Sequence, residues 1–227
     1  MNIGILIFPN VTQLDATGPA QVLCRVPGAT LHMVWKTLEP VKTDAGFSIV
    51  PTTTFKDCPP LDVICIPGGA GQIDLMNDAE TLAFVAKQGA AAKYVTSVCT
   101  GSLVLGAAGL LKGYKSACHW ASRDLLSAFG AIPVAERVVH DRNRFSGGGV
   151  TAGIDFGLTL LAEIAGEDVA KSVQLGLEYD PQPPFQSGSP EKAGAERTAL
   201  VRTAMGPMIE RRQKANATAA TALFQGR

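Results

Sequence analysis

Short, nearly all-apolar segments alternate with helical patterns along most of this chain, and this alternation is what most constrains its fold. Residues 3–8, 63–66 and 94–98 are dense in β-branched and apolar side chains, and each run ends at a turn or at small residues. Strands that are apolar on both faces are typical of a parallel sheet covered by helices on both sides. The sequence therefore predicts an α/β fold with a mainly parallel sheet sandwiched by helices.

The remaining elements continue the alternation up to a proline-rich loop. Further strands or extended stretches are predicted at residues 30–37, 47–55 and 134–139, and residues 145–146 lead into three glycines. Helices are predicted at residues 19–25, 78–92 (with Asp78 as the N-cap), 100–111, 121–129, 151–165 and 167–178. After the loop, a C-terminal appendage, about 190–227, is predicted as one long helix with a frayed tail. No repeat and no linker divides the chain, so we expect residues 1–227 to form a single domain.

Charge and hydropathy exclude several classes of protein. The 227 residues carry 20 Lys and Arg against 20 Asp and Glu, a formal net charge of zero, so nothing favours nucleic-acid binding. No apolar run approaches the ~20 residues that cross a bilayer. The first residues lack the pattern of a signal peptide, so no membrane association and a cytoplasmic location are expected. Charged residues are only 18% of the chain against a typical ~25%, which favours a large core or a subunit interface.

The five cysteines are expected to be free thiols. They stand at positions 24, 58, 65, 99 and 118, an odd number with no Cys-x-x-Cys pair and no zinc-ligand spacing. The sequence therefore predicts no metal site, and in a reducing compartment these cysteines should be free thiols. Most free cysteines are small buried hydrophobic residues, so the question is whether one of them is reactive.

Cys99 is the strongest candidate for a nucleophile. The strand predicted at 94–98 leads directly into a helix through Cys99-Thr100-Gly101, which resembles the nucleophile elbow that presents a reactive atom above a sheet. A helix N-terminus lowers the pKa of a thiol, so the position favours a thiolate. The alternative is an unreactive cysteine at the buried end of a strand.

Two other loops are expected at the same edge of the sheet, because chemistry in open α/β folds gathers at the carboxyl ends of strands. Asp15 follows the first strand in a predicted loop, where it is either a proton donor and acceptor for Cys99 or an ordinary helix cap. Pro67-Gly68-Gly69 follows the strand at 63–66, where it either brings a backbone N–H close to a ligand or is simply a tight turn.

Histidine is scarce around the predicted nucleophile. A cysteine peptidase or amidotransferase needs a histidine to activate the thiol and to protonate a leaving amine, but Thr100 follows Cys99. His119, in Cys118-His119-Trp120, is the one histidine expected near the site, and a structural role beneath a packed tryptophan is the alternative. Acyl transfer with an amine leaving group is therefore disfavoured.

These segments resemble the ThiJ/PfpI superfamily, which has the flavodoxin-like, class I glutamine amidotransferase-like fold. Within it, the sequence is similar to the isocyanide hydratases, and the resemblance covers nearly the whole chain. The segments that carry it are residues 8–15 (FPNVTQLD), 66–69 (IPGG), 98–101 (VCTG), 118–120 (CHW), 146–155 (SGGGVTAGID), 177–185 (LEYDPQPPF) and 188–190 (GSP). The chain departs from much of the superfamily at Asp15, where Glu is common, and from its peptidase-like members at Thr100, where they carry His.

The resemblance implies hydration of an isocyanide to the N-substituted formamide, without a cofactor. The thiolate of Cys99 would add to the isocyanide carbon while Asp15 supplies the proton, giving a covalent thioimidate that water then hydrolyses. The two groups are expected to titrate as a coupled pair.

The same resemblance implies roles for residues around the pair. The N–H groups of Gly69 and Thr100 would stabilise the tetrahedral oxygen, and the turn from Gly148 to Val150 would pack near the nucleophile.

The resemblance also implies a homodimer acting on a small molecule. Two other functions stay open at this point. A glutathione-independent glyoxalase would use the same thiol with a nearby histidine, so the geometry of His119 discriminates it. A non-enzymatic thiol sensor would use the oxidation of Cys99 and show no turnover.

Overall fold

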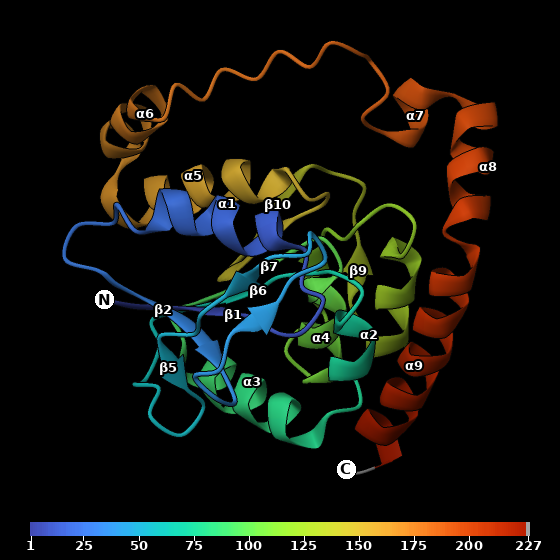
Figure 1. The fold of residues 1–227 in the computed structure, drawn as a ribbon, viewed down its shortest axis with the longest axis horizontal. Helices are drawn as coiled ribbons and strands as arrows, with labels where there is room; N and C mark the ends of the chain where they lie inside the picture. The colour runs from blue at the N-terminus through green and yellow to red at the C-terminus, as the bar shows by residue number, and fades with distance from the viewer. Residues whose placement is uncertain (226–227) are drawn as a thin grey trace.

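A seven-stranded sheet forms the centre of the computed structural model, which describes residues 1–225 (Figure 1). Its strands, in spatial order, are β10 (Val138–Asp141), β11 (Arg144–Gly147), β7 (Tyr94–Val98), β6 (Val63–Ile66), β1 (Asn2–Leu6), β2 (Thr30–Trp35) and β5 (Thr53–Thr54). Every neighbouring pair is parallel except β10 and β11, which form an antiparallel pair at one edge. Two small ladders lie outside the sheet: β3 (Val41–Lys42) with β4 (Ser48–Ile49), and β8 (Lys115–Ser116) with β9 (Ile132–Pro133).

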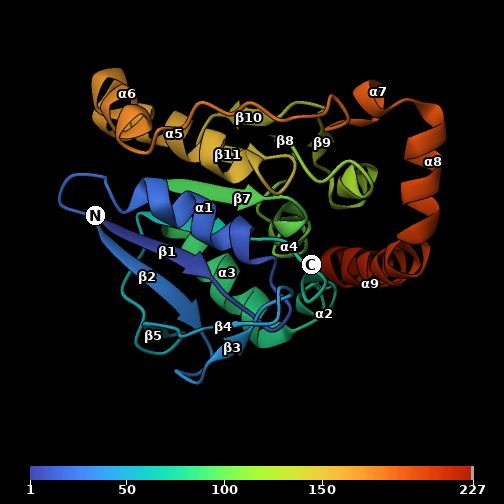
Figure 2. The ribbon, with the colours of Figure 1, turned by 45° about the horizontal axis from the view of Figure 1, so that its top comes forward.

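Helices cover both faces of the sheet (Figures 1 and 2). One face carries α1 (Gln13–Leu23) and α5 (Ala152–Ala165), with α6 (Glu167–Gly176) packed on α5. The other face carries α3 (Ala79–Ala91), α4 (Gly101–Ala107), the short α2 (Gln72–Leu75) and the 3-10 helix η1 (Arg123–Phe129). The α/β sandwich expected from the sequence is therefore confirmed.

Alternation of side chains along the strands produces two cores. On β1, Ile3 and Ile5 face the α1/α5 layer while Leu6 faces the α3/α4 layer, and all three are at most 1% exposed. Successive side chains of a strand point to opposite faces of the sheet, so apolar residues at every position fill both layers. Each fully buried aliphatic side chain contributes roughly 1.5–3 kcal/mol to stability.

Several predicted elements differ from the observed ones. Helix α1 begins at Gln13 instead of residue 19 and runs through Pro19, because α5 packs closely against it: a Cβ at Gly153 would lie 3.0 Å from the Pro19 ring. The strand predicted at 134–139 is wrong, since β10 begins at Val138. The stretch at 47–55 divides into two short strands around Pro51, and the helix at 121–129 is a 3-10 helix. The N-cap at Asp78 is confirmed by the bond that its side chain accepts from the Thr81 N–H.

Residues 190–225 form an arm, hereafter the C-terminal arm, that runs down one side of the molecule (Figure 1). It contains α7 (Pro190–Ala193), α8 (Ala195–Ala204) and α9 (Gly206–Gln225) instead of the single helix predicted. Gly194 separates the first two helices because its φ of +78° is outside the helical region. Helix α9 packs on η1, α2 and α4, and it continues through the Ala/Thr segment that was expected to fray. Within residues 1–225, no helix is both long and apolar enough to cross a bilayer.

Candidate active site

Cys99 sits on a strained turn between β7 and α4. Its φ is +56°, a left-handed conformation that costs a non-glycine residue about 1–3 kcal/mol and that is concentrated at functional sites. The Cys99 N–H donates to Gly147 O at 2.9 Å on the neighbouring strand β11. Gly101 makes the turn possible, because a Cβ there would overlap the carbonyl oxygen of Ile66. The elbow geometry expected from the sequence is therefore present.

Asp15 lies in the first turn of α1 and not in a loop, and it is 0% exposed. The Gly68 N–H donates to Asp15 Oδ2 at 2.8 Å. Asp15 Oδ1 has no hydrogen-bond partner within the part of the chain that the structure describes. Gly68 is required at this approach, because a Cβ there would lie 2.6 Å from Thr100 N and 2.9 Å from Asp15 Oδ2. The structure thus brings Asp15, Gly68 and the Cys99-Thr100 turn together.

Burial raises the pKa of the Asp15 carboxyl from 3.8 to about 7. Loss of water around the carboxylate is the largest cause, and the exposed carboxylate of Asp44 adds to it. The Gly68 N–H and the Cys99 thiol oppose the rise. A carboxyl group with a pKa near 7 exchanges its proton readily at neutral pH, as a general acid and base must.

The pKa of the Cys99 thiol lies well above its ordinary value, mainly because the side chain is buried and next because Asp15 is negative when ionised. The Thr100 N–H lowers this pKa, as expected for the start of a helix, but its effect is smaller than that of burial. The expectation that the helix N-terminus would make Cys99 a low-pKa thiolate is therefore wrong. Cys99 and Asp15 instead share their ionisation, since each changes the pKa of the other.

Thr100 and Gly69 lie against each other beside the elbow. Thr100 is 3% exposed, and its side-chain oxygen accepts a hydrogen bond from the Gly69 N–H at 3.3 Å. Both N–H groups proposed for oxyanion binding are therefore at the site, with that of Gly69 already engaged by a long hydrogen bond.

The turn from Gly148 to Val150 lies against the same elbow. The Gly148 N–H donates to Arg137 O at 2.9 Å, so it is not a free donor for a substrate oxygen. Val150 packs against the apolar cluster that contains Cys99.

His119 reaches the site through its backbone. Its N–H donates to Cys99 O at 3.3 Å, while its ring Nδ1 accepts from the Ala121 N–H at 3.3 Å and the ring leans on Trp120. Burial and the charge of Arg212 lower the pKa of His119 to about 4, so the ring is neutral at neutral pH. No side-chain hydrogen bond joins it to Cys99 among residues 1–225. These contacts agree with the structural role.

Sequence reasoning missed Arg212, a buried side chain of α9 that lies near the site. It donates from Nε to Gln72 Oε1 at 3.0 Å and from Nη1 to Ser122 Oγ at 3.1 Å. Burial lowers the pKa of Arg212, and the Cys118 and Cys99 thiols oppose this when ionised; Arg212 in turn lowers the pKa of Cys118. The α9 sequence is polar overall, so no hydrophobic pattern separates this buried arginine from its exposed neighbours.

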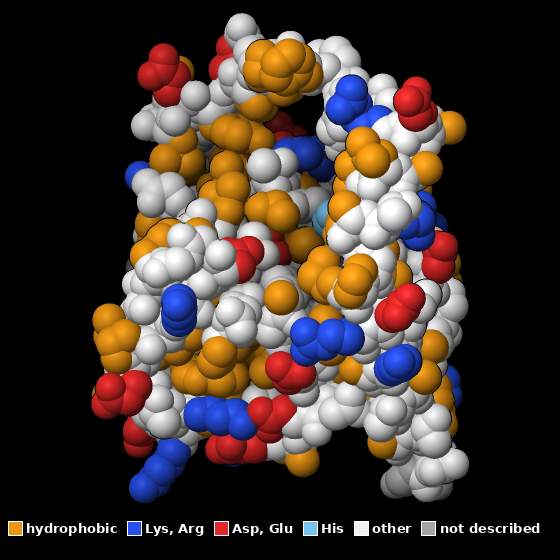
Figure 3. Space-filling view, turned by 45° about the vertical axis from the view of Figure 1, so that its right-hand side comes forward, with side chains coloured by type: hydrophobic (Ala, Val, Ile, Leu, Met, Phe, Trp, Pro, Cys, Tyr) orange, Lys and Arg blue, Asp and Glu red, His pale blue; other side chains and the backbone are white. Residues whose placement is uncertain are grey.

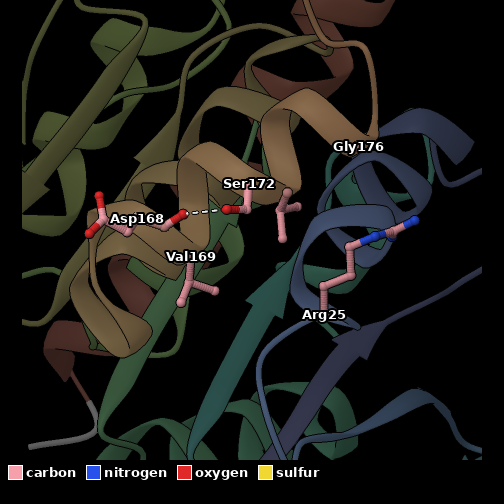
Figure 4. A pocket seen from close by; sticks show the side chains of 6 residues that line it. Arg25, Asp168, Val169, Ser172 and Gly176 are labelled. Carbon is pink, nitrogen blue, oxygen red and sulfur yellow. Dashed lines mark hydrogen bonds between the residues drawn. The ribbon is translucent and has the colours of Figure 1, made fainter.

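An open groove on the surface lies away from this site. It is an open hollow of about 430 Å³ between the end of α1 and α6, lined by Arg25, Asp168, Val169, Ser172, Val173 and Gly176 (Figure 4). The bond drawn there, from Ser172 Oγ to Asp168 O, lies within α6. Asp15 is at the first turn of α1, whereas this groove is at the other end of that helix. We assign it no part in the chemistry.

Comparison with known proteins gives the family. The model of the DJ-1/PfpI family matches residues 1–163, the region that holds the elbow, Asp15 and the Gly68-Gly69 turn. The chain belongs to the DJ-1/PfpI family. This membership confirms the resemblance seen in the sequence, and the match stops before the C-terminal arm.

Two relatives of known description differ in how much of their own length this chain matches. The chain is 55% identical over 223 residues to the isonitrile hydratase of Pseudomonas putida, covering 98% of each chain. It is 30% identical to the HTH-type transcriptional regulator GbdR of Pseudomonas aeruginosa, covering 79% of this chain and 51% of the regulator.

Solved structures of the DJ-1/PfpI family share the fold. A ThiJ/PfpI family protein from Pseudomonas syringae is 50% identical, with a TM-score of 0.89, covering 96% of this chain and 90% of that one. DJ-1beta of Drosophila melanogaster is 21% identical, with a TM-score of 0.70, covering 78% of this chain and 97% of that one. The first similarity extends into the C-terminal arm, because it covers more of the chain than the family match.

Proposed function

We propose that this protein hydrates an isocyanide to the corresponding N-substituted formamide, with Cys99 as nucleophile and Asp15 as general acid and base. The observation that carries the proposal is the pairing of these two groups: a cysteine on a strained elbow beside a fully buried carboxyl whose pKa is about 7. Similarity over 98% of both chains to a protein named isonitrile hydratase supports the choice of substrate.

The first half of the reaction adds the thiol across the isocyanide carbon. At a pH above its first pKa, the Cys99–Asp15 pair has lost one of its two protons. The remaining proton is either on the sulfur or on the carboxyl. The Cys99 sulfur forms a bond to the terminal carbon, and the shared proton passes to that carbon through Asp15. The product is a thioimidate, Cys–S–CH=N–R, with Asp15 left as the carboxylate.

The second half returns the enzyme to its starting state. Asp15, now a carboxylate, takes a proton from water as the water oxygen bonds to the thioimidate carbon. Asp15 passes this proton to the nitrogen of the tetrahedral intermediate and takes the proton of its new hydroxyl group, the C–S bond breaks, and the N-substituted formamide leaves. The proton held by Asp15 then belongs again to the Cys99–Asp15 pair, so one water is consumed and no other reactant is needed.

Backbone N–H groups at the elbow can stabilise the negative charge that develops on the oxygen of the tetrahedral intermediate during the second half of the reaction. The Thr100 N–H lies close enough to the Cys99 sulfur to lower the pKa of that thiol. The Gly69 N–H is held by the Thr100 hydroxyl at 3.3 Å, a long and weak bond. An anionic oxygen is a stronger acceptor than a hydroxyl, so this donor is available to the intermediate.

The site geometry favours hydration over the two alternatives. A glyoxalase that relies on histidine needs that ring near the thiol, but His119 Nδ1 is engaged by Ala121 and the ring makes no hydrogen bond to Cys99. A thiol sensor reacts through its thiolate, whereas burial raises the pKa of Cys99. A thiol that ionises together with its general acid is better suited to turnover.

We also propose that the protein acts as a homodimer in the cytoplasm. Large apolar side chains are exposed at the end of α6, on the following loop and on the C-terminal arm: Leu175 (82% exposed), Phe185 (78%), Leu200 (69%) and Val201 (41%). Figure 3 shows hydrophobic side chains at the surface on the side of the molecule that carries the arm. A second copy would bury such groups, and light scattering at micromolar concentration tests the dimer. The five free cysteines suit a reducing compartment.

The test of the function is turnover of a simple aryl isocyanide, measured as loss of isocyanide and appearance of formamide. We expect wild type to be active, Cys99→Ser to be inactive, and Asp15→Asn to lose about 100-fold to 10,000-fold, the usual contribution of a general acid or base. Asp180→Asn is the matched control, because Asp180 is exposed. In H₂¹⁸O, the formamide is expected to carry one ¹⁸O.

Two results would count against the proposal. If wild type produced no formamide, the substrate class would be wrong while the family membership would stand. If Cys99→Ser retained full activity, the covalent mechanism would be wrong even though the reaction was right.

A further inference from the structure

Arg212, on the C-terminal arm, is a buried positive charge without a buried anion to neutralise it. The side chain is 2% exposed, and no carboxylate within residues 1–225 lies at ion-pair distance from it; the exposed Asp74 of α2 approaches its neighbour Arg211 instead, at 3.8 Å. Burying an unpaired guanidinium is costly. A compensating interaction is therefore expected close to Arg212.

The two hydrogen bonds of Arg212 lead to the two loops that hold the catalytic pair. Its Nε donates to Gln72, the first residue of α2. That residue follows directly on the turn at 68–71, whose first N–H binds Asp15. Arg212 thereby fixes the loop that supports the carboxyl.

The second bond reaches the other loop. Arg212 Nη1 donates to Ser122 Oγ, and the Ser122 N–H donates to His119 O at 2.9 Å. The His119 N–H in turn donates to Cys99 O at 3.3 Å. One side chain of the C-terminal arm therefore ties together the supports of both Asp15 and Cys99.

We propose that Arg212 is a positioning residue for the hydration: it clamps the two loops around Cys99 and Asp15, and its charge favours the state in which that pair carries one negative charge. This rests on the proposed function. The negative charge of the Cys99–Asp15 pair then compensates the buried positive charge of Arg212. In agreement, ionised Cys118 and Cys99 raise the pKa of Arg212, and the charge of Arg212 lowers the pKa values of Cys118 and His119.

The other groups that act on the catalytic pair have different origins. Asp15 comes from α1 and is affected by Asp44, while Cys118 precedes η1 and is affected by Arg123. The charged neighbours of Arg212 on α9 are all exposed to water: Glu210, Arg211 and Lys214. Arg212 lowers the pKa of the Cys118 thiol, and Cys118 in turn acts on Cys99, so removal of the Arg212 charge should be visible in the titration of the pair.

The experiment compares Arg212→Gln and Arg212→Met, which remove the charge, with Arg212→Lys, which keeps it. The control is Asn216→Ala, one turn further along α9, because Asn216 is equally buried and anchors the helix through Leu125 O at 3.2 Å without carrying charge. Two quantities are measured against pH: kcat/KM for an aryl isocyanide, and the rate at which iodoacetamide alkylates the Cys99 peptide, followed by mass spectrometry.

We expect both neutral variants to move the acid limb of both profiles to higher pH, by about one pH unit, since a nearby opposite charge shifts a pKa by ~1–3 when close and less with distance. Arg212→Lys should restore most of the shift. Asn216→Ala should lower the urea midpoint and leave both pH profiles in place. Ser122→Ala removes the hydrogen bond from Arg212 Nη1 but keeps the positive charge. It should lower kcat without moving the acid limb of the pH profiles.

The inference is overturned if a folded neutral variant has the pH profiles of wild type, or if Asn216→Ala shifts them as much as Arg212→Gln does. The alkylation measurement needs no isocyanide turnover. A shift in alkylation without formamide production would therefore reject the proposed function while leaving the effect of Arg212 on the Cys99 thiol in place.

Discussion

Asp15 should reduce the stability of the protein while serving its chemistry. Its pKa rises from 3.8 to about 7 on folding, and each pKa unit corresponds to about 1.4 kcal/mol. The native state binds the proton more tightly than the unfolded chain does. Folding stability should therefore fall as the pH rises from about 4 to about 7, by up to ~4 kcal/mol in total, and stay level with respect to this group above that pH.

The substitution Asp15→Asn isolates this term. Asparagine has no charge to desolvate, and its side-chain oxygen can still accept the Gly68 N–H, but its amide nitrogen would be buried where Asp15 Oδ1 lacks a partner. That buried donor costs ~1–3 kcal/mol at every pH. We therefore compare the free energy of unfolding of the variant with that of wild type at each pH. This difference should change in favour of the variant by up to ~4 kcal/mol between pH 4 and pH 8.

The assay is urea unfolding at pH 4, 5, 6, 7 and 8, at one fixed protein concentration because association with a second copy would add stability. Asp180→Asn, on an exposed carboxyl, should show no such trend. A stability difference between Asp15→Asn and wild type that stays constant over this range would refute the reasoning, because it would mean that Asp15 is ionised as easily in the folded protein as in the unfolded chain.

Three further predictions concern the same site. The kcat/KM of wild type should rise about tenfold per pH unit below an apparent pKa near 7 and level off above it, since the Cys99–Asp15 pair must lose one proton to react; a pH-independent rate would contradict this. Asp44→Asn should move that limb to lower pH, because Asp44 raises the pKa of Asp15, and the difference should shrink in ~1 M salt. Gly101→Ala should destabilise the fold by ~3 kcal/mol or more in urea unfolding, because the added Cβ would overlap the carbonyl oxygen of Ile66. An unchanged urea midpoint would contradict this, because it would mean that the elbow has room for a side chain at this position.

Local pattern was enough to find the sheet and the elbow. Residues 63–66 are apolar throughout and residues 94–98 are mostly β-branched or apolar, and they form β6 and β7 with the predicted bounds. Cys99 was found because a strand, a cysteine and a glycine follow one another directly, and all three serve one turn. Signals of this kind are contained in a few neighbouring residues.

Features that depend on contacts between distant parts of the chain could not be predicted from the local sequence pattern. Pro19 suggested a helix start, but packing of α1 against Gly153 carries the helix through it and moves Asp15 into the first turn. The pKa of Cys99 follows from burial and from Asp15, which are distant in sequence from the helix start that suggested a low value. Arg212 is 140 residues from Gln72, and nothing near it in the sequence marks it as buried.

The central claim is that Cys99 forms a covalent bond to the isocyanide carbon during turnover, and rapid-quench mass spectrometry tests it most directly. We expect the Cys99 peptide of wild type to gain the mass of one isocyanide within the first turnover and to lose it as formamide appears. Cys118→Ser, which alters the neighbouring buried thiol, should still form the adduct, and Cys99→Ser should not. Formamide production by an enzyme whose Cys99 is never modified would contradict the mechanism.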